Sequence, residues 1–268
     1  AAPAGRHFYG HGAFSPDGRL LYTTENDFDG ERGVIGVYDA TKGFARIAEF
    51  PSHGIGPHEM RLMPDGETLA VANGALLTHP KMPRVVRNKP TMKPNLVLLD
   101  RRTGALRRKT ELAPDLHQAS LRHLSTAPDG RVAFGLQYQG PAGDPVPLVG
   151  LVEPAGSVRL FDRAPGPTRA MRQYCGSVAF DRSGRIIATS SPRGGVVAFW
   201  DAATGKALSV LKVADGCGLA ALPTDNCFLV TSGTGEAFLA DGRRGTLKRF
   251  QSRFPRTARW DNHIVTVT

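Results

Sequence analysis

Cysteine is scarce in this sequence, with three residues among 268. Cys175, Cys217 and Cys227 fit neither a CxxC metal knuckle nor a dense disulfide framework, and no CxxCH motif is present that would attach a haem. The odd number leaves at least one thiol unpaired. Cys175 and Cys217 each precede a glycine at the start of a predicted strand, so a disulfide, a thiolate metal ligand and simple packing are all open for this pair.

Long apolar runs are also missing. The longest, such as 186–190 and 194–200, have the length of strands and fall far short of the ~20 residues of a membrane helix. We therefore predict a soluble protein without a membrane span. The first five residues have no basic and apolar leader, so we expect any export signal to have been removed or left out.

The common catalytic motifs are absent from the sequence. It contains no nucleophile elbow, phosphate loop, HExxH zinc helix or dinucleotide fingerprint. The short Gly-Thr-Gly run at 233–235 is predicted to be a hairpin turn, because strands and no helix flank it. Motifs therefore do not decide whether the protein is an enzyme.

Positive charge is in excess, with 34 Lys and Arg against 24 Asp and Glu and a formal net charge of +10. Such a molecule attracts polyanions non-specifically. Nucleic-acid binding needs basic residues that cluster with aromatics, and here they are scattered from Arg6 to Arg243. We therefore predict no nucleic-acid partner.

Glycine and proline are plentiful, with 31 and 20 residues spread over the whole chain. An apolar content of 41% supplies a core, and no Pro-rich, Ser-rich or single-sign charged block divides the sequence. This composition is typical of a protein in which tight turns recur. We predict one all-β domain over residues 1–268.

A turn phrase recurs at intervals of roughly one propeller blade. Its copies are FSPDGR (14–19), MPDGE (63–67), APDGR (127–131) and the degenerate FDRSGR (180–185) and LPTDN (222–226). Proline presets φ at the first corner and Asp-Gly tolerates positive φ, so each copy predicts a hairpin turn between two strands.

A second signature follows each turn: a strand that ends in aspartate and then a Thr-Gly type turn. It occurs as GVYDATKG (36–43), VLLDRRTG (97–104) and AFWDAATG (198–205), with a looser copy at 160–162. Together the two signatures predict a β-propeller of four-stranded antiparallel blades. The blades are expected at 8–52, 53–114, 115–168, 169–213 and 214–251, with a sixth fragment of about two strands at 254–268. About six blades are then present and the ring looks open, so we expect a missing segment at its N-terminal side.

Several longer phrases are more specific than a generic propeller. They are GRHFYGHG (5–12), YTTEND (22–27), RGVIGVYD (32–39), SHGIGPHE (52–59), TMKPNL (91–96), HQ with LRHL (117–124), FGLQYQG (134–140) and TSSPRGG (189–195). Through them the chain resembles, over almost its whole length, the bacterial family catalogued as domain of unknown function 1513.

The resemblance implies a secreted, periplasmic propeller with an export signal and one further blade ahead of residue 1, which would bring the ring to seven. It also implies genes near imelysin-like iron-regulated proteins and a di-haem oxidoreductase, which suggests metal acquisition and possible protein partners. The family name states no activity, so no residue role is carried over from it.

The first strand of each propeller blade lines the central channel. Residues that stand a fixed number of positions before each turn are therefore expected at the same height along the channel axis, here called a level. Five residues before the turns stand His11, Glu59 and His123, and at the neighbouring level stand His58, Arg122 and Cys217. Imidazole, carboxylate and thiolate are ligands for iron, copper or zinc. The sequence predicts either a metal or small-ligand site here or a hydrated polar channel without a metal role.

Blade two has one extra residue before its turn, so a bulge could bring His58 rather than Glu59 into the ring. We predict that His11, His58 and His123 bind the metal and that Glu59 orients an imidazole. Arg122, Gln137 and Tyr138 are further candidates for ligand binding. Two long loops, 73–94 and 137–154, either form binding surfaces or pack against the next blade.

Three functions are compatible with these observations. The first is a periplasmic binding or accessory protein of a metal-uptake system. The second is a metal-dependent hydrolase or oxidoreductase, and the third is a structural scaffold for other proteins. The fold does not choose among them, because propellers serve all three purposes.

Overall fold

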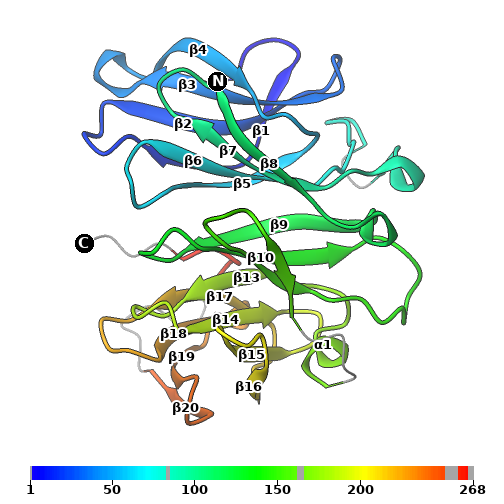
Figure 1. Ribbon diagram of the computed structural model, residues 1–268, viewed down its shortest axis with the longest axis vertical. Coiled ribbons are helices and arrows are strands. Elements are labelled where there is room, and N and C mark those ends of the chain that lie inside the picture. Colours follow the sequence, from blue (N-terminus) through cyan, green and yellow to red (C-terminus); the bar gives the residue numbers. More distant parts are fainter. Residues whose placement is uncertain (1, 83–84, 162–165, 251–258, 265–268) are drawn as a thin grey trace. The chain divides into compact units, whose positions relative to one another are not determined.

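A computed structural model describes residues 2–82, 85–161, 166–250 and 259–264. These residues form five antiparallel sheets of four strands each, and within each sheet the strands are neighbours in chain order (Figure 1). The strands of the first two sheets are β1 (Arg6–Phe14), β2 (Leu20–Asp27), β3 (Arg32–Asp39), β4 (Ala45–Pro51), β5 (Pro57–Leu62), β6 (Thr68–Asn73), β7 (Asn95–Asp100) and β8 (Leu106–Glu111).

The other three sheets repeat this order. Their strands are β9 (Ala119–Thr126), β10 (Val132–Tyr138), β11 (Val149–Val152), β12 (Val158–Leu160), β13 (Ser177–Phe180), β14 (Ile186–Ser191), β15 (Val196–Asp201), β16 (Ala207–Lys212), β17 (Gly216–Ala221), β18 (Cys227–Ser232), β19 (Ala237–Asp241) and β20 (Thr246–Arg249). Helix is confined, in the described residues, to α1 (Pro167–Ala170) and three short 3-10 turns, η1 (Ala40–Lys42), η2 (Lys89–Thr91) and η3 (Pro114–Leu116). None of these is long and apolar enough to cross a membrane.

The predicted turn phrase connects the first two strands of every sheet. Its glycines at 18, 66, 130 and 184 all have φ between 67° and 87°, the left-handed region that glycine reaches without steric cost. In the fifth copy Asn226 takes this conformation with φ of 64°. Asparagine tolerates left-handed backbone better than other residues with a side chain, so the degenerate copy still makes its turn.

The expected number of blades needs correction. We predicted about six here and seven in the family, and the described residues contain five sheets. Most of the expected sixth fragment, 254–268, lies outside the described residues, and its described part, 259–264, contains no strand. This fragment carries neither of the two turn signatures on which the other blades were predicted. Closure of the sheets into a ring stays a prediction.

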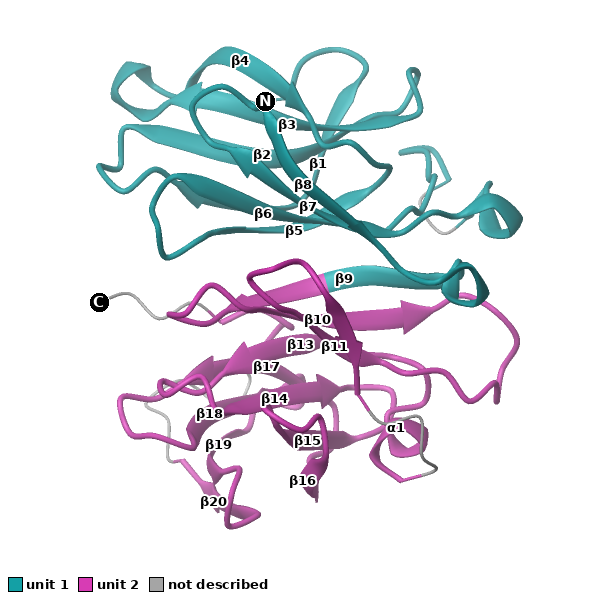
Figure 2. Cartoon of the chain, in the orientation of Figure 1, with its two compact units in different colours: residues 1–122 teal, residues 123–268 magenta. Residues whose placement is uncertain are grey.

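The chain divides into two compact units, residues 1–122 and 123–268 (Figure 2). The division falls inside β9, so this strand contributes residues to both. The prediction of a single domain over 1–268 stays a prediction.

Unit 1 contains the first two sheets, which share one apolar core. Its members include Tyr22, Ile35, Met60, Leu69 and Val97, all at most 1% exposed. Because side chains alternate between the two faces of a strand, these residues all lie on the faces by which the sheets β1–β4 and β5–β8 pack together. In this packing β1 lies against β5, so the first strands of successive sheets are neighbours.

Unit 2 has its own core between the sheets β13–β16 and β17–β20. Phe199 and Phe228 meet there with ring centroids 5.5 Å apart, and both are fully buried. Trp200 is also buried, and its indole nitrogen donates a hydrogen bond of 2.9 Å to Thr189. Strand β13 lies against β17, which repeats the neighbour relation of first strands seen in unit 1.

Candidate functional site

In unit 1, the predicted site residues His11, His58 and Glu59 lie together at the contact of β1 and β5. The imidazole rings of His11 and His58 have centroids 5.3 Å apart. A ligand nitrogen of His11 and a carboxylate oxygen of Glu59 lie within 4.8 Å of each other. Residues 48 positions apart in sequence are thus brought to one place by the pairing of first strands.

The expected bulge in the second sheet is present. The pairing of β5 with β6 shifts register between Pro57 and Glu59, so His58 is the extra residue. Opposite it, Gly10 has φ of 139°, and a Cβ added there would lie 3.5 Å from the carbonyl oxygen of His58. The backbone conformation, rather than a lack of space for a side chain, therefore favours glycine at this position. The choice of His58 over Glu59 as a metal ligand stays a prediction.

Glu59 is a buried carboxylate, with 1% of the residue exposed. Arg61 pairs with it, and two guanidinium nitrogens lie 2.6 and 2.7 Å from Oε1. A buried charge needs such compensation, because removal from water costs several kcal/mol. The ion pair keeps a carboxylate next to the imidazoles, and these two ligand types suit zinc, copper or iron.

Arg122 was predicted to bind a ligand, and the structure places it against an aromatic ring of unit 1. Its guanidinium carbon lies 6.0 Å from the centre of the Tyr9 ring, a cation–π contact. Tyr9 in turn lies edge-on to His58, with centroids 6.3 Å apart. Arg122 therefore borders the His11, His58 and Glu59 group through Tyr9, and its role in binding stays a prediction.

In unit 2, His123 lies beside a histidine that the sequence analysis missed. His123 is 2% exposed, and its ring centroid is 5.3 Å from that of His263. Ligand nitrogens of these two residues lie within 4.8 Å of each other. The register argument counted back from turn phrases, and no such phrase follows His263. Only a search for histidine by residue type could have found it.

Gln137 and Cys217, two further predicted residues of unit 2, contact protein groups. The Gln137 amide donates to the Cys175 carbonyl at 3.1 Å and lies 3.5 Å from Nε2 of His123. The Cys217 thiol donates to the Thr231 carbonyl at 3.5 Å. Burial raises the pKa of the Cys217 thiol, so the neutral thiol is favoured unless a metal displaces its proton. Within the described residues, none of the three cysteines forms a disulfide.

Tyr138, the last of the predicted ligand-binding residues, supports the loop after β10. Its hydroxyl donates to the Asp144 carboxylate at 2.8 Å. Burial and this hydrogen bond raise the pKa of Tyr138. The other long loop, 73–94, buries Ala75, Leu76 and Met92 in a small cluster of its own. Both loops are structured where they are described, and binding by either one stays a prediction.

Comparison with known proteins agrees with the resemblance seen in the sequence. No curated protein matches the chain. The profile of the family described as "Protein of unknown function (DUF1513)" matches residues 1–267. Because this match covers nearly the whole sequence, the chain belongs to the DUF1513 family.

Proposed function

We propose that this chain binds a transition metal, iron, copper or zinc, through histidine and glutamate side chains on the first strands of its sheets. The observation that carries the proposal is the pair of His11 and Glu59 in unit 1, whose ligand atoms lie within 4.8 Å of each other. Two ligands of one metal ion with bonds of about 2.0–2.2 Å are separated by roughly 3–4 Å, so a small side-chain movement would suffice.

Two further observations support metal binding. The His58 ring stands next to His11 and could supply another nitrogen. In unit 2, His123 and His263 form a second pair of neighbouring imidazoles. Neutral imidazole is the commonest nitrogen ligand of zinc, copper and iron. The sequence-based idea that residues of several blades bind one ion stays a prediction.

We further propose that the five sheets are blades of a β-propeller that acts as a periplasmic binding or accessory protein in metal acquisition. The recurring turns support the propeller, and the resemblance stated above supports the periplasm and a partner of the imelysin-like or di-haem kind. A metal-dependent hydrolase or oxidoreductase would use the same residues, so the proposals separate only by experiment. A pure scaffold would need no metal.

The test is elemental analysis of protein purified without a chelating resin. We expect close to one equivalent or more of iron, copper or zinc, and a clear loss on His11→Ala and on Glu59→Gln, because each substitution removes a ligand. His58→Ala tests the bulged histidine, and His123→Ala tests unit 2. His117→Ala is the matched control, since His117 is partly exposed and, in the part of the chain that the structure describes, its ring hydrogen-bonds to the Pro114 carbonyl, away from the proposed ligands.

Circular dichroism and melting temperature show whether each variant is folded. The metal proposal would be contradicted if the folded wild-type protein carries no metal and takes none up from a buffered iron, copper or zinc solution. The structural scaffold would then be the remaining function. A turnover assay on the metal-loaded protein then separates a binding protein from an enzyme.

A further inference from the structure

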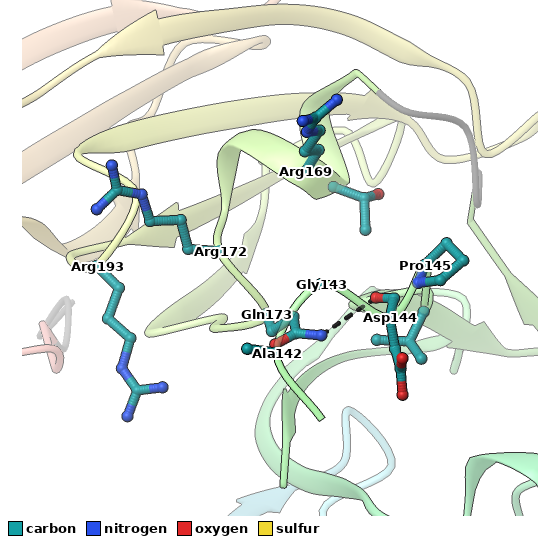
Figure 3. Close-up of a pocket in the computed structure, with 10 residues that line it drawn as sticks. Ala142, Gly143, Asp144, Pro145, Arg169, Arg172, Gln173 and Arg193 are labelled. Carbon is teal, nitrogen blue, oxygen red and sulfur yellow. Dashed lines mark hydrogen bonds between the residues drawn. The ribbon is translucent and has the colours of Figure 1, made fainter. Parts of the chain in front are cut away.

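Unit 2 contains a cavity of about 810 Å³ that no part of the metal proposal uses. Its walls come from the loop after β10, from α1 and the residues that follow it, and from the turn between β14 and β15 (Figure 3). Cavities of 300–1,000 Å³ are typical of sites for small organic molecules. The size therefore suits a ligand larger than an inorganic ion.

Three arginines line this cavity: Arg169, Arg172 and Arg193. Within the described part of the chain, the structure shows no ion pair for any of the three guanidinium groups. By contrast, Arg131 and Arg185 of the same unit pair with Asp129 and Asp225, at 2.7 and 3.2 Å. The positive charge of the cavity arginines is thus not compensated by ion pairs, in contrast to that of Arg131 and Arg185.

One acid, Asp144, belongs to the cavity wall, and within the described residues it forms no ion pair with the three arginines. Its carboxylate accepts the hydrogen bond of the Tyr138 hydroxyl at 2.8 Å. Against three guanidinium groups, this one carboxylate leaves two positive charges in excess. Ala142, Pro145 and Val146 supply apolar surface in the same wall. The lining is therefore cationic at its arginines and apolar between them.

Hydrogen bonds fix the walls of the cavity to one another. The Gln173 side-chain amide donates to the Asp144 carbonyl at 3.1 Å and to the Pro141 carbonyl at 3.0 Å, and the first of these bonds is drawn in Figure 3. The Ser191 hydroxyl donates to the Met171 carbonyl at 2.6 Å. Connections of this kind reduce the entropy that ligand binding would otherwise cost.

Backbone conformation adds a second sign of a built site. Arg172 and Gln173 are consecutive residues with side chains, and both have left-handed φ, 48° and 57°. Each such residue costs on the order of 1 kcal/mol, and strain of this kind concentrates at ligand sites. Arg193 is held too, because its guanidinium carbon lies 4.5 Å from the centre of the Tyr174 ring.

From this arrangement we propose that the cavity binds an extended organic anion, with two or more carboxylate or phosphate groups separated by an apolar segment. Figure 3 shows the three guanidinium groups at separate points around the cavity rather than converging on one. A single compact anion would reach one arginine, whereas an extended anion reaches several. Arginine binds carboxylate and phosphate in the same bidentate manner, so the two share one recognition chemistry.

Calorimetric titration with defined probes tests this site. The probes are suberate, a linear dicarboxylate, its monocarboxylate analogue octanoate, and a hexane diphosphonate of similar length. We expect saturable binding of suberate or of the diphosphonate at one site per chain, about 10-fold tighter than binding of octanoate. Whichever of the two dianions binds more tightly indicates whether the natural ligand carries carboxylate or phosphate groups.

Substitutions separate the roles of charge and cavity. Arg172→Asn removes a charge while asparagine keeps the left-handed backbone, and Arg193→Gln removes a second charge. Each should weaken dianion binding about 10-fold or more. Ala142→Trp places an indole at the cavity wall without a change in charge and should weaken binding about 10-fold or more if the ligand occupies the cavity. Arg243→Gln, an exposed arginine outside the cavity, is the matched control and should change the affinity less than about 2-fold.

Two results would overturn the proposal. One is the absence of saturable binding by both dianions in a folded protein. The other is an equal loss of affinity on Arg243→Gln and on the cavity variants, which would show attraction by net charge alone. Because none of these residues belongs to the metal proposal, failure of either proposal leaves the other standing.

Discussion

At the scale of single residues, charge pairing is concentrated on one face of the first sheet. Glu49 accepts hydrogen bonds from Arg6, Arg32 and Arg46, at 2.8 to 3.3 Å. Arg46 also pairs at 2.8 Å with Glu25, which is fully buried. Burial alone would raise the pKa of Glu49, but the three guanidinium groups outweigh it and lower the pKa to about 2.

This shift predicts a dependence of stability on pH. An unfolded glutamate has a pKa of 4.5, so the stabilisation from Glu49 is complete above that value and is lost as the pH falls toward 2. Because the side chain is partly exposed, we expect a contribution on the order of 1–2 kcal/mol. Glu49→Gln should therefore flatten the curve of unfolding free energy against pH between about 5 and about 2, measured by denaturant titration.

Glu111→Gln provides the comparison, since Glu111 is exposed and, among the residues that the structure describes, its ion pair is with Lys109. If this variant flattens the acid limb as much as Glu49→Gln does, the stabilisation does not come from the arginine group around Glu49.

At the scale of elements, the fourth turn shows how a degenerate copy of the repeat keeps its conformation. It lacks proline, and Asp181 stands where the first copy has Ser15. The Asp181 carboxylate accepts from the backbone nitrogens of Arg185 and Ile186, both at 2.9 Å, and from that of Asn226 in the next sheet at 3.0 Å. One buried side chain thus replaces the missing turn chemistry and ties two sheets of unit 2 together.

Loss of this carboxylate should be costly. Asp181→Ala removes the acceptor of three backbone N–H groups, of which that of Ile186 is buried and the other two are partly buried, and we expect a loss of about 1–3 kcal/mol in unfolding free energy. Asp129→Ala makes the same substitution at another position of the turn, in the intact third copy, where the carboxylate is about half exposed, so a loss under about 1 kcal/mol is expected. Equal losses in urea denaturation would show that Asp181 has no special part in the turn.

At the scale of the whole molecule, the chain has two compact units with separate apolar cores. Strand β9 contributes residues to both units, and the sheet β9–β12 therefore draws on both. A continuous strand at the division favours unfolding of both units in one step. Without such a strand, two apolar cores built from different residues would favour two separate unfolding steps.

Calorimetry with one core variant in each unit decides between these outcomes. Leu69→Ala in unit 1 and Phe228→Ala in unit 2 each leave a cavity that costs about 2–5 kcal/mol. We expect a single transition, lowered by about 5–10 °C in either variant. Two transitions, of which each variant moves only one, would contradict the prediction of a single domain.

The repetitive part of the fold was accessible from the sequence. Pro-Asp-Gly phrases determine hairpin turns locally, because the φ values of a few consecutive residues decide them. The β5 bulge was accessible as well, since one surplus residue before a turn must be accommodated by the strand that precedes it. The absence of a catalytic motif could likewise be read directly from the residues.

What only the tertiary structure decided concerns residues without local signals. His263 follows no turn phrase, so nothing in its neighbourhood indicates that it lies beside His123. Arg169 lies in α1, Arg172 directly follows this helix, and Arg193 lies in the turn between β14 and β15, and in the sequence they look like scattered surface charges. They line one cavity because the packing of α1 against the turn after β14 brings distant segments together, and such contacts depend on the whole of unit 2 rather than on local sequence.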